Sequence, residues 1–586
     1  MNIDSIMKRR LVFIISFSVA FTILSARFFY LQIYKQAQYL RESEKNRIRE
    51  VTVQPTRGLI FDRTKNILVD NIPSYSVYAI PFEVQKSDSV IDLLSKIIKV
   101  PVNDIKKTIQ ENKRSLFTPV KLKRMIDFEM LSMIEESRLQ LPGIIYDIEP
   151  RRFYPSIVRA PHIFGYLGEI NHRELEENRD RNYRPGDIIG KKGLEKVYDE
   201  ILKGVRGFRY IEVDALGREV RTLDSRPEIL PIPGKNLHLT IDSTIQSYIE
   251  SRMDTLRGGA VVVDCRNGEI LALVSKPDYD PEIFTKPISP DTWNKLLSDP
   301  GKPLYDRMVQ SIYPPGSTYK LILASAALET GTIDKDWSNT CYGSYRLGRR
   351  NFDCWNPEGH GELDLLGAIE QSCNVYFYKL GLKVGLDAWS HFSSILKFGE
   401  KTGIDLNEES SGIVPSTEYL DQKYGEGKWS RGLLLNLSVG QGDLLVTPLQ
   451  LARMAMILAN SGVYHPFHLV RYIEDPIDQS LKWTKMDSVM IEGISRETYE
   501  IVRQGMFRVV NGKKGTAKAC WFPDLKVAGK TGTAENPHGD DHAWFIGFTP
   551  FDKPEIAFCV LVENGGSGGA IAAPIARNII KNYYRR

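Results

Sequence analysis

The 586-residue sequence has little cysteine and almost no charge imbalance. Six cysteines in a chain of this length exclude a small scaffold held together by disulfides. Lysine and arginine number 77 against 73 acidic residues, so the net charge of +4 gives no case for a nucleic-acid-binding protein. Internal repeats and low-complexity tracts are missing too. With 42% hydrophobic and 26% charged residues, the chain is neither disordered nor fibrous, and its length predicts two to four domains.

Long apolar runs are also missing, with one exception at residues 11–26, which contain no charged residue. This scarcity excludes a polytopic membrane protein. Lys8, Arg9 and Arg10 precede the run. By the positive-inside rule they predict a cytoplasmic tail at 1–10, a single transmembrane anchor at 11–32, and an external location for the rest. A cleaved signal peptide is the alternative interpretation, but Arg27 lies where cleavage would be expected.

Residues 33–234 are charged and interrupted by proline and glycine. Residues 36–49 predict a polar helix, and 51–71 predict a hairpin with a polar turn at 63–66. Helical periodicity between 87 and 136 predicts a small α-rich insert, at about 82–148. Because no spacing here is typical of a catalytic site, we interpret this part as a spacer or interaction module.

Residues 235–586 predict a single α/β domain. Strand-like runs at 259–263 and 269–274 are joined through Asn267-Gly268, a dipeptide typical of hairpin turns. A largely helical middle part follows. Strands at both ends around a helical block predict a sheet that pairs the two ends of the domain. The remaining predicted elements are strands at 525–533, 543–549 and 555–562 and a final helix at 572–584.

The first chemical motif is Ser317-Thr-Tyr-Lys320, which follows a turn-forming Pro-Pro-Gly and precedes the apolar helical run 321–328. Ser317 is therefore expected in the first turn of a helix, with Lys320 one turn later on the same face. A lysine can activate a serine hydroxyl as a base if burial or a second cation favours its neutral form. The alternative interpretation is a helix cap followed by a surface lysine.

Two further motifs occur later in the chain. Ser372-Cys373-Asn374 places a hydroxyl and an amide two positions apart, where both can face one cleft. Lys530-Thr531-Gly532-Thr533 ends a strand-like run, and Gly532 would allow a ligand backbone to approach the strand closely. Lys530 would supply positive charge for a substrate carboxylate and would lower the pKa of a neighbouring lysine. Each motif alone is weak and has an ordinary loop or turn as its alternative.

Together and in this order, SxxK, SxN and KTG are typical of serine β-lactamases and penicillin-binding proteins. The whole chain resembles a class B penicillin-binding protein, closest to the elongation-specific penicillin-binding protein 2. The doubled proline before Gly316 favours the elongation type over the division type. Asn374 stands where that type often has Asp, although Asn is commoner in the wider family. The further matching motifs are Arg57-Gly58-x-Ile60-x-Asp62-Arg63, Arg152-x-Tyr154-Pro155, His162 with Gly165-Tyr166-x-Gly168, Gly193-Leu194-Glu195, Gly440-Gln-Gly442 and the extension of KTG to Glu535.

The resemblance implies a single transmembrane helix, an elongated α+β pedestal domain at 33–234, and an α/β penicillin-binding domain with an antiparallel sheet at 235–586. It implies a peptidoglycan D,D-transpeptidase that cross-links stem peptides during cell-wall elongation and cell-shape maintenance and is acylated by β-lactams. It also implies a cytoplasmic-membrane protein with a periplasmic catalytic domain, and a SEDS-family glycosyltransferase as partner. The alternatives are a division-type transpeptidase, a D,D-carboxypeptidase, a β-lactamase, and a non-catalytic β-lactam sensor or scaffold.

The resemblance also implies residue roles. Ser317 would attack the D-Ala-D-Ala carbonyl, Lys320 would accept its proton, and Ser372 would help deliver a proton to the departing D-Ala. Asn374 would bind the donor amide, and Lys530, Thr531 and Thr533 would hold the carboxylate. The backbone N–H groups of Ser317 and Thr533 would form an oxyanion hole.

Three of the six cysteines lie close together in the sequence and share their region with a histidine. Cys341, Cys354, His360 and Cys373 offer three thiolates and an imidazole, a complete tetrahedral set for structural Zn²⁺. Some proteins of the penicillin-binding protein 2 type resemble this, with zinc held by Asp, Asp, His and Cys. A Cys341–Cys354 disulfide and unrelated free thiols are the alternatives. Cys265 and Cys559 are expected in the core, and Cys520 has no assignment.

Overall fold

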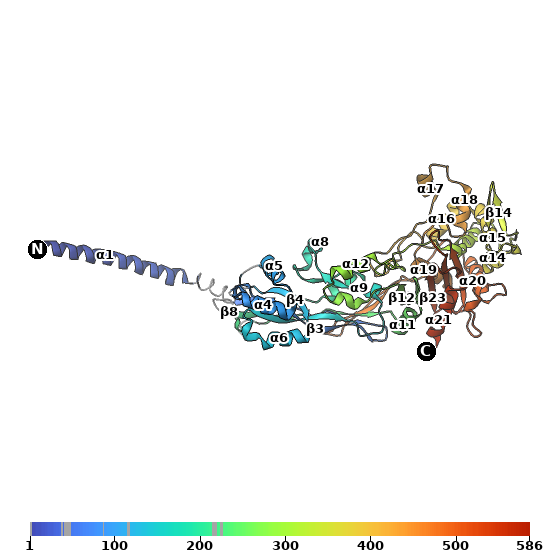
Figure 1. Cartoon of the computed structure of the whole chain (residues 1–586). Coiled ribbons are helices and arrows are strands. Elements are labelled where there is room, and N and C mark those ends of the chain that lie inside the picture. Colours follow the sequence, from blue (N-terminus) through green and yellow to red (C-terminus); the bar gives the residue numbers. More distant parts are fainter. Residues whose placement is uncertain are drawn as a thin grey trace. The chain divides into compact units, whose positions relative to one another are not determined.

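The computed structural model describes residues 3–36, 39, 48–85, 87–113, 116, 118–213, 219–222 and 227–585. The chain divides into two compact units (Figure 1). Unit 1 comprises Met1–Thr56, Pro73–Glu149 and Gly204–Pro233, and unit 2 comprises Arg57–Ile72, Pro150–Lys203 and Gly234–Arg586. The sequence predicts a single domain boundary at 234/235. In the structure, Arg57–Ile72 and Pro150–Lys203 precede that boundary but belong to unit 2 with the C-terminal part of the chain.

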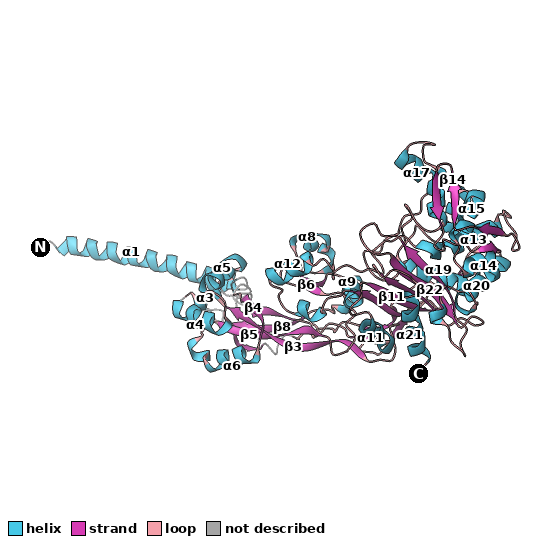
Figure 2. Cartoon of the chain, turned by 45° about the vertical axis from the view of Figure 1, so that its right-hand side comes forward, coloured by secondary structure: helices cyan, strands magenta, loops and turns pink. Residues whose placement is uncertain are grey.

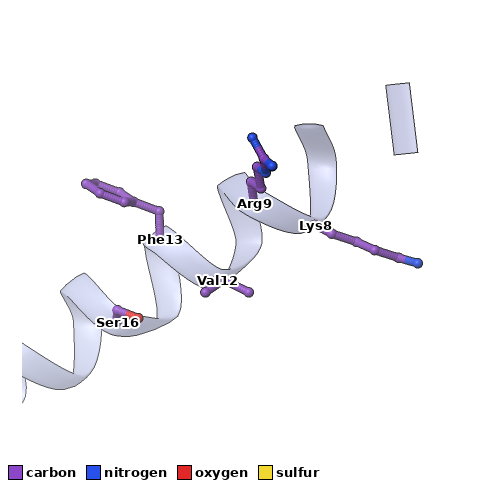
Figure 3. Close-up of a pocket in the computed structure, with 5 residues that line it drawn as sticks. All are labelled: Lys8, Arg9, Val12, Phe13 and Ser16. Atoms are coloured by element: carbon purple, nitrogen blue, oxygen red, sulfur yellow. The ribbon is translucent and has the colours of Figure 1, made fainter. Parts of the chain in front are cut away.

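The N-terminal apolar run forms a helix. Helix α1 (Ile3–Phe29) continues into the short π-helix η1 (Tyr30–Tyr34). The stretch Met7–Tyr34 is long and apolar enough to cross a membrane, and its most apolar 18 residues have a mean hydropathy of 2.0, with none of them buried. Figure 3 shows Lys8 and Arg9 on the same helix as Val12, Phe13 and Ser16, at the end of the run where the basic residues precede it. Most of the polar helix predicted at 36–49 lies outside the described residues.

Unit 1 contains the predicted α-rich insert, with one strand that the prediction missed. Helices α4 (Asp88–Ile98), α5 (Val102–Asn112) and α6 (Phe128–Glu136) share an apolar core with strand β4 (Val120–Ile126). In β4 the apolar Val120 and Leu122 alternate with Lys121 and Lys123, a period of two that favours a strand over a helix. A separate antiparallel sheet has the order β1-β8-β9, formed by Ile48–Val53, Gly207–Val213 and Glu219–Thr222.

The predicted hairpin at 51–71 is right in its turn and wrong in its first strand. Strand β2 (Ile60–Phe61) pairs antiparallel with β3 (Ile67–Ala79), whereas residues 51–53 belong to β1 and pair with β8. The Asp62 carboxylate accepts hydrogen bonds from the backbone N–H groups of Thr64 and Asn66, each at 2.8 Å. These bonds close the polar turn, because a short acidic side chain can replace the missing backbone acceptors.

A buried ion network joins two segments of unit 2 that precede residue 234. Arg57 Nη2 lies 2.6 Å from Glu195 Oε2 and 2.7 Å from Asp199 Oδ1, and Arg152 Nε lies 2.7 Å from Glu195 Oε1. The Glu195 side chain has no exposed surface. Two guanidinium groups thus face two carboxylates, which balances the charge inside the protein.

The main sheet of unit 2 pairs the two ends of the predicted α/β domain, as expected. Its order is β12-β11-β23-β22-β21, and all its pairs are antiparallel. Helix α19 (Pro448–Ala459) packs against β11, β22 and β23 (Figure 2). Helices α11 (Ser243–Arg252) and α21 (Ala572–Tyr584) contact each other and also pack against the sheet, α11 on β12 and α21 on β22 and β23. Its strands are Gly258–Asp264 (β11), Ile270–Lys276 (β12), Ala528–Ala534 (β21), His542–Thr549 (β22) and Ile556–Val562 (β23).

Strand β21 lies at the edge of this sheet, and among the described residues no strand pairs with its outer edge. The short helix η5 (Gly316–Tyr319), which leads into α13 (Lys320–Glu329), packs against β21. The helical middle part then follows. Among its described residues, the β14–β15 hairpin and two further two-stranded sheets, β13-β16 and β17-β20, lie within it, with β17 at Val463–Tyr464 and β20 at Val489–Met490. Its elements are β13 (Asn339–Cys341), β14 (Ser344–Leu347), β15 (Arg350–Asp353), β16 (Gly361–Leu363), α14 (Leu365–Glu370), α15 (Asn374–Val384), α16 (Leu386–Ile395), α17 (Thr417–Tyr424), α18 (Arg431–Ser438) and α20 (Arg496–Asn511).

Candidate active site

Ser317 lies where the sequence predicts it, in the first turn before a buried helix. It occupies η5, directly ahead of α13, and its side chain is partly exposed while Thr318, Tyr319 and Lys320 are buried. The apolar residues of α13 anchor this turn in the core. Among the described residues, no group forms a hydrogen bond with the Ser317 hydroxyl, so it is free to meet a ligand.

Three glycines bring η5 against two neighbouring segments. A Cβ atom added to Gly316 would lie 2.6 Å from the Thr533 carbonyl oxygen, and one added to Gly532 would lie 2.9 Å from the Pro315 carbonyl oxygen. A Cβ on Gly440 would lie 2.0 Å from the Gly316 carbonyl oxygen, and the Gly316 N–H donates to the Gly440 carbonyl oxygen at 2.9 Å. The backbones approach too closely for any other residue, which places the turn carrying Ser317 directly beside β21.

The other predicted polar residues meet in a hydrogen-bonded cluster. Lys320 Nζ donates to the Ser372 carbonyl oxygen at 2.8 Å, to Ser372 Oγ at 3.3 Å and to Asn374 Oδ1 at 2.7 Å. Lys530 Nζ donates to Ser372 Oγ at 2.8 Å and to the Thr531 carbonyl oxygen at 3.1 Å. The structure therefore connects the three sequence motifs through one hydroxyl.

The loop carrying that hydroxyl has an unusual backbone. Ser372 has a φ of +54°, in the left-handed region that residues other than glycine seldom adopt. The next helix, α15, begins immediately afterwards, and the Cys373 sulfur accepts from the Tyr376 N–H at its N-terminus. The fold therefore holds Ser372 in a costly conformation that turns its hydroxyl between the two lysines, as is common at functional sites.

The two lysines are fully buried and have no carboxylate partner within ion-pair distance among the described residues. Burial lowers the pKa of Lys320 to about 8. Burial, and then the charge of Lys320, lower the pKa of Lys530 well below its usual value. Two ammonium groups around one hydroxyl repel each other, so the site favours a neutral amine on one of them. A neutral amine has the lone pair that a general base needs.

The residues assigned to carboxylate binding are divided between the interior and the surface. Thr533 is exposed, and its carbonyl oxygen accepts from Gln441 Nε2 at 3.4 Å. Thr531 is nearly buried and its hydroxyl forms a 2.7 Å hydrogen bond with that of Thr516. Lys530 is fully buried and its amine donates to Ser372 Oγ, so it does not reach the surface and can act on a carboxylate only through its positive charge.

The four predicted metal ligands come together. The Sγ atoms of Cys341, Cys354 and Cys373 and one ring nitrogen of His360 all lie within 4.8 Å of one another. Cys354 Sγ is 3.5 Å from His360 Nδ1, and its hydrogen bond with Cys373 lowers the pKa of the Cys354 thiol. Three thiols and one imidazole facing one point fit a structural Zn²⁺. All six cysteines are free, and Cys265, Cys520 and Cys559 are buried in the core.

Sequence reasoning missed two neighbours of this site. Trp355 Nε1 donates to the Gln371 carbonyl oxygen at 3.0 Å, directly before Ser372, and its ring packs edge-on against His360. Thr516, described above, fixes Thr531. Trp355 directly follows the predicted ligand Cys354, and this position could have placed it at the site. Nothing near Thr516 in the sequence indicates that its partner is Thr531.

Comparison with known proteins agrees with this geometry. Residues 258–581 match the family model of the penicillin binding protein transpeptidase domain, and residues 52–239 match that of the penicillin-binding protein dimerisation domain. The peptidoglycan D,D-transpeptidase MrdA of Haemophilus influenzae is 33% identical over 605 residues, which cover 98% of this chain and 91% of that protein.

Two solved structures are similar over most of the chain. The complex between penicillin-binding protein PBP2 and MreC from Helicobacter pylori has a TM-score of 0.79 at 29% identity, covering 92% of this chain and all of that one. A solved structure of a peptidoglycan synthase complex, which concerns the coordination of polymerization and crosslinking, has a TM-score of 0.72 at 26% identity and covers 98% of both chains.

Proposed function

Since the chain belongs to the penicillin-binding protein transpeptidase family, we propose that it is a peptidoglycan D,D-transpeptidase of the elongation type. The observation that carries the proposal is the pair of buried lysines that share the Ser372 hydroxyl, because Lys320 follows Ser317 by one turn and Lys530 lies on β21, against which that turn packs. Two buried lysines without carboxylates are costly, and lowered pKa values of this kind cluster at functional sites. A scaffold would have no use for this arrangement.

In the first step, the Ser317 oxygen attacks the carbonyl carbon of the D-Ala-D-Ala bond of a donor stem peptide. Lys320 accepts the hydroxyl proton, and the backbone N–H groups of Ser317 and Thr533 stabilise the oxyanion. Ser372, bonded to both lysines, passes a proton to the departing D-Ala amine. The C–N bond breaks, D-Ala leaves, and an ester with Ser317 remains.

In the second step, an amine of an acceptor stem peptide attacks the ester carbonyl. The new C–N bond forms the cross-link, the C–O bond to Ser317 breaks, and the proton lost by the amine returns to the serine oxygen. Asn374 is partly exposed, so its amide can bind the donor peptide. Thr533 and Thr531 hold the donor carboxylate, with Lys530 supplying positive charge from beneath.

Labelling by a fluorescent penicillin tests this proposal, because β-lactams acylate the same serine. Wild-type protein should form a stable covalent adduct, and Ser317→Ala should form none, since the oxygen that forms the ester is gone. Thr318→Val, whose hydroxyl only donates to the Pro315 carbonyl oxygen, is the neighbouring control and should still be labelled. Undiminished labelling of Ser317→Ala would refute the assignment, and analysis of products with peptidoglycan substrate then distinguishes cross-linking from hydrolysis.

We place the catalytic unit on the periplasmic side of the cytoplasmic membrane. Lys8, Arg9 and Arg10 precede the apolar helix, so the positive-inside rule leaves the short N-terminus in the cytoplasm. The neighbouring structures include PBP2 with MreC and a peptidoglycan synthase complex, which support a place in an elongation assembly. We propose a polytopic SEDS-family glycosyltransferase as the partner that supplies glycan strands.

We further propose that Cys341, Cys354, His360 and Cys373 hold a structural Zn²⁺. When bound, zinc would fix four points of the chain and thereby brace the loop that carries Ser372 and Asn374. Metal analysis of the full-length protein purified without added zinc should find about one equivalent, in line with a closed four-ligand site. Cys354→Ser should lose the metal, while Cys520→Ser, a buried cysteine outside the cluster, should retain it. Absence of zinc from wild-type protein would contradict the proposal.

A further inference from the structure

A basic β-hairpin lies between two of the candidate zinc ligands in the chain. Strands β14 and β15 pair antiparallel from Ser344↔Asp353 to Leu347↔Arg350, and Figures 1 and 2 both show β14 beside α15. Cys341 precedes the hairpin and Cys354 follows it, and the Cys354 N–H donates to the Gly343 carbonyl oxygen at 2.8 Å. The base of the hairpin is therefore fixed, while its tip is free.

The charge of this hairpin is one-sided. Residues 342–353 contain Arg346, Arg349 and Arg350 against the single acid Asp353, a formal charge of +2. All three arginines are exposed, and none of the described carboxylates lies within ion-pair distance of them. Arg346 Nε donates only to the Gly348 carbonyl oxygen at 3.3 Å, and the Arg350 guanidinium lies 5.1 Å from the centre of the Phe352 ring. Their guanidinium groups thus retain donors for an external anion.

The hairpin also adjoins the active site. Asn374 Nδ2 donates to the Asp353 carbonyl oxygen at 3.4 Å, and the Tyr378 hydroxyl donates to the same oxygen at 3.3 Å. The loop 372–374 therefore lies between strand β21 and the β14–β15 hairpin, since Lys530 of β21 contacts Ser372 and Asp353 of the hairpin contacts Asn374. Two exposed aromatic side chains flank the base of the hairpin, Tyr342 at 81% and Trp355 at 59% exposure.

A peptide with free carboxylates is the ligand that this surface fits. Guanidinium groups bind carboxylates through paired hydrogen bonds, and exposed aromatic rings provide contact area for a peptide chain. In the proposed reaction the donor peptide pairs with the edge of β21. The side of the loop 372–374 that faces the hairpin, away from β21, is then left for the acceptor peptide. A stem peptide that ends in D-Ala carries at least its C-terminal carboxylate, which is complementary to the positive charge of the hairpin.

We propose that Arg346, Arg349 and Arg350 on the β14–β15 hairpin bind the carboxylates of the acceptor stem peptide and guide its amine toward the acyl-enzyme at Ser317. This inference rests on the proposed transpeptidase function. The contribution of exposed arginines should be moderate and should weaken with salt, because solvent-exposed charges are screened.

Binding and acyl transfer with synthetic stem tripeptides test the inference. One probe carries free carboxylates and a side-chain amine, and the other has the same amine with its carboxylates amidated. Arg349→Glu/Arg350→Glu should weaken binding of the first probe to the full-length protein about tenfold, equivalent to about 1.4 kcal/mol, and raise its KM in acyl transfer from a thioester donor similarly. The amidated probe should bind weakly to wild type and variant alike.

Lys482→Glu/Lys485→Glu is the matched control. It changes the charge by the same amount at two exposed lysines on and just after β19 (Leu481–Trp483), and it should leave both probes unaffected. Equal binding of the free-carboxylate probe to wild type and the arginine variant, or equal losses with both probes, would overturn the inference. Arginine-dependent binding without any acyl transfer by wild type would count against the transpeptidase proposal and leave the hairpin assignment supported.

Discussion

Unit 2 contains two buried charged clusters with opposite composition. In the first, Arg57 and Arg152 face Glu195 and Asp199, so each charge has a partner of opposite sign. In the second, Lys320 and Lys530 share the hydroxyl of Ser372 and have no carboxylate. Burial desolvates the charges of both clusters, but only in the first do ion pairs oppose that cost.

The pKa shifts follow this difference. Burial raises the pKa of Glu195, yet the charges of Arg152 and Arg57 outweigh that effect and hold it below its usual value. Burial lowers the pKa of Lys320 to about 8, and no carboxylate opposes it. The first cluster therefore keeps its charges at neutral pH and stabilises the fold, whereas the second can lose a proton and do chemistry.

Lys320→Met should have the largest effect on the acylation rate of the variants considered, and it should lower activity without lowering stability. We expect the rate of acylation by a fluorescent penicillin to fall by about 10²–10⁴-fold, because the general base is lost. The melting temperature should stay the same or rise, since Met fills a similar volume without a buried amine. Stopped-flow acylation and thermal unfolding measure the two quantities. Acylation at the wild-type rate would remove Lys320 from the mechanism.

Glu195→Gln should have the opposite profile. Removing one carboxylate leaves Arg57 and Arg152 without sufficient counter-charge, and we expect the free energy of unfolding to fall by about 3–5 kcal/mol. Acylation of the protein that remains folded should proceed at nearly the wild-type rate, because the network makes no contact with Ser317. Denaturant titration and acylation kinetics of the same preparation test both statements.

Asp552→Asn provides the control for this second comparison. Its partner Lys526 lies 2.9 Å away, but both side chains are more than half exposed. Loss of such a pair should change stability by less than about 1 kcal/mol. A loss as large as that of Glu195→Gln would mean that burial does not explain the difference between the pairs.

The sequence allowed most of the second cluster to be predicted, and very little of the first. Lys320, Ser372 and Lys530 lie in short motifs whose residue types are tied to one chemistry, and the strands and final helix that carry them have strong apolar patterns. The pairing of Arg57 and Arg152 with Glu195 joins residues up to 138 positions apart, and nothing local in the sequence indicates which acid meets which base. The motif resemblance named these residues without explaining them.

Other differences have local causes. Strand β4 was missed because its lysine and arginine residues hid an alternating pattern inside a helical region. The burial of Lys530 was also not predicted, since a lysine at the end of a strand is ordinarily expected in solvent. The β14–β15 hairpin has only four residues in each strand, and its pattern is too short to distinguish from a loop.

The contact among Gly316, Gly440 and Gly532 has a consequence for drug resistance. Substitutions that reshape the surface around Ser317 would be an obvious route for a bacterium to exclude a β-lactam, but at these three positions even one methyl group would collide with backbone atoms. Such a change would displace the nucleophile and harm the cell wall as much as the antibiotic does. Escape mutations compatible with growth should therefore arise at more exposed positions around Ser317, where side chains can change without moving the turn that carries the serine.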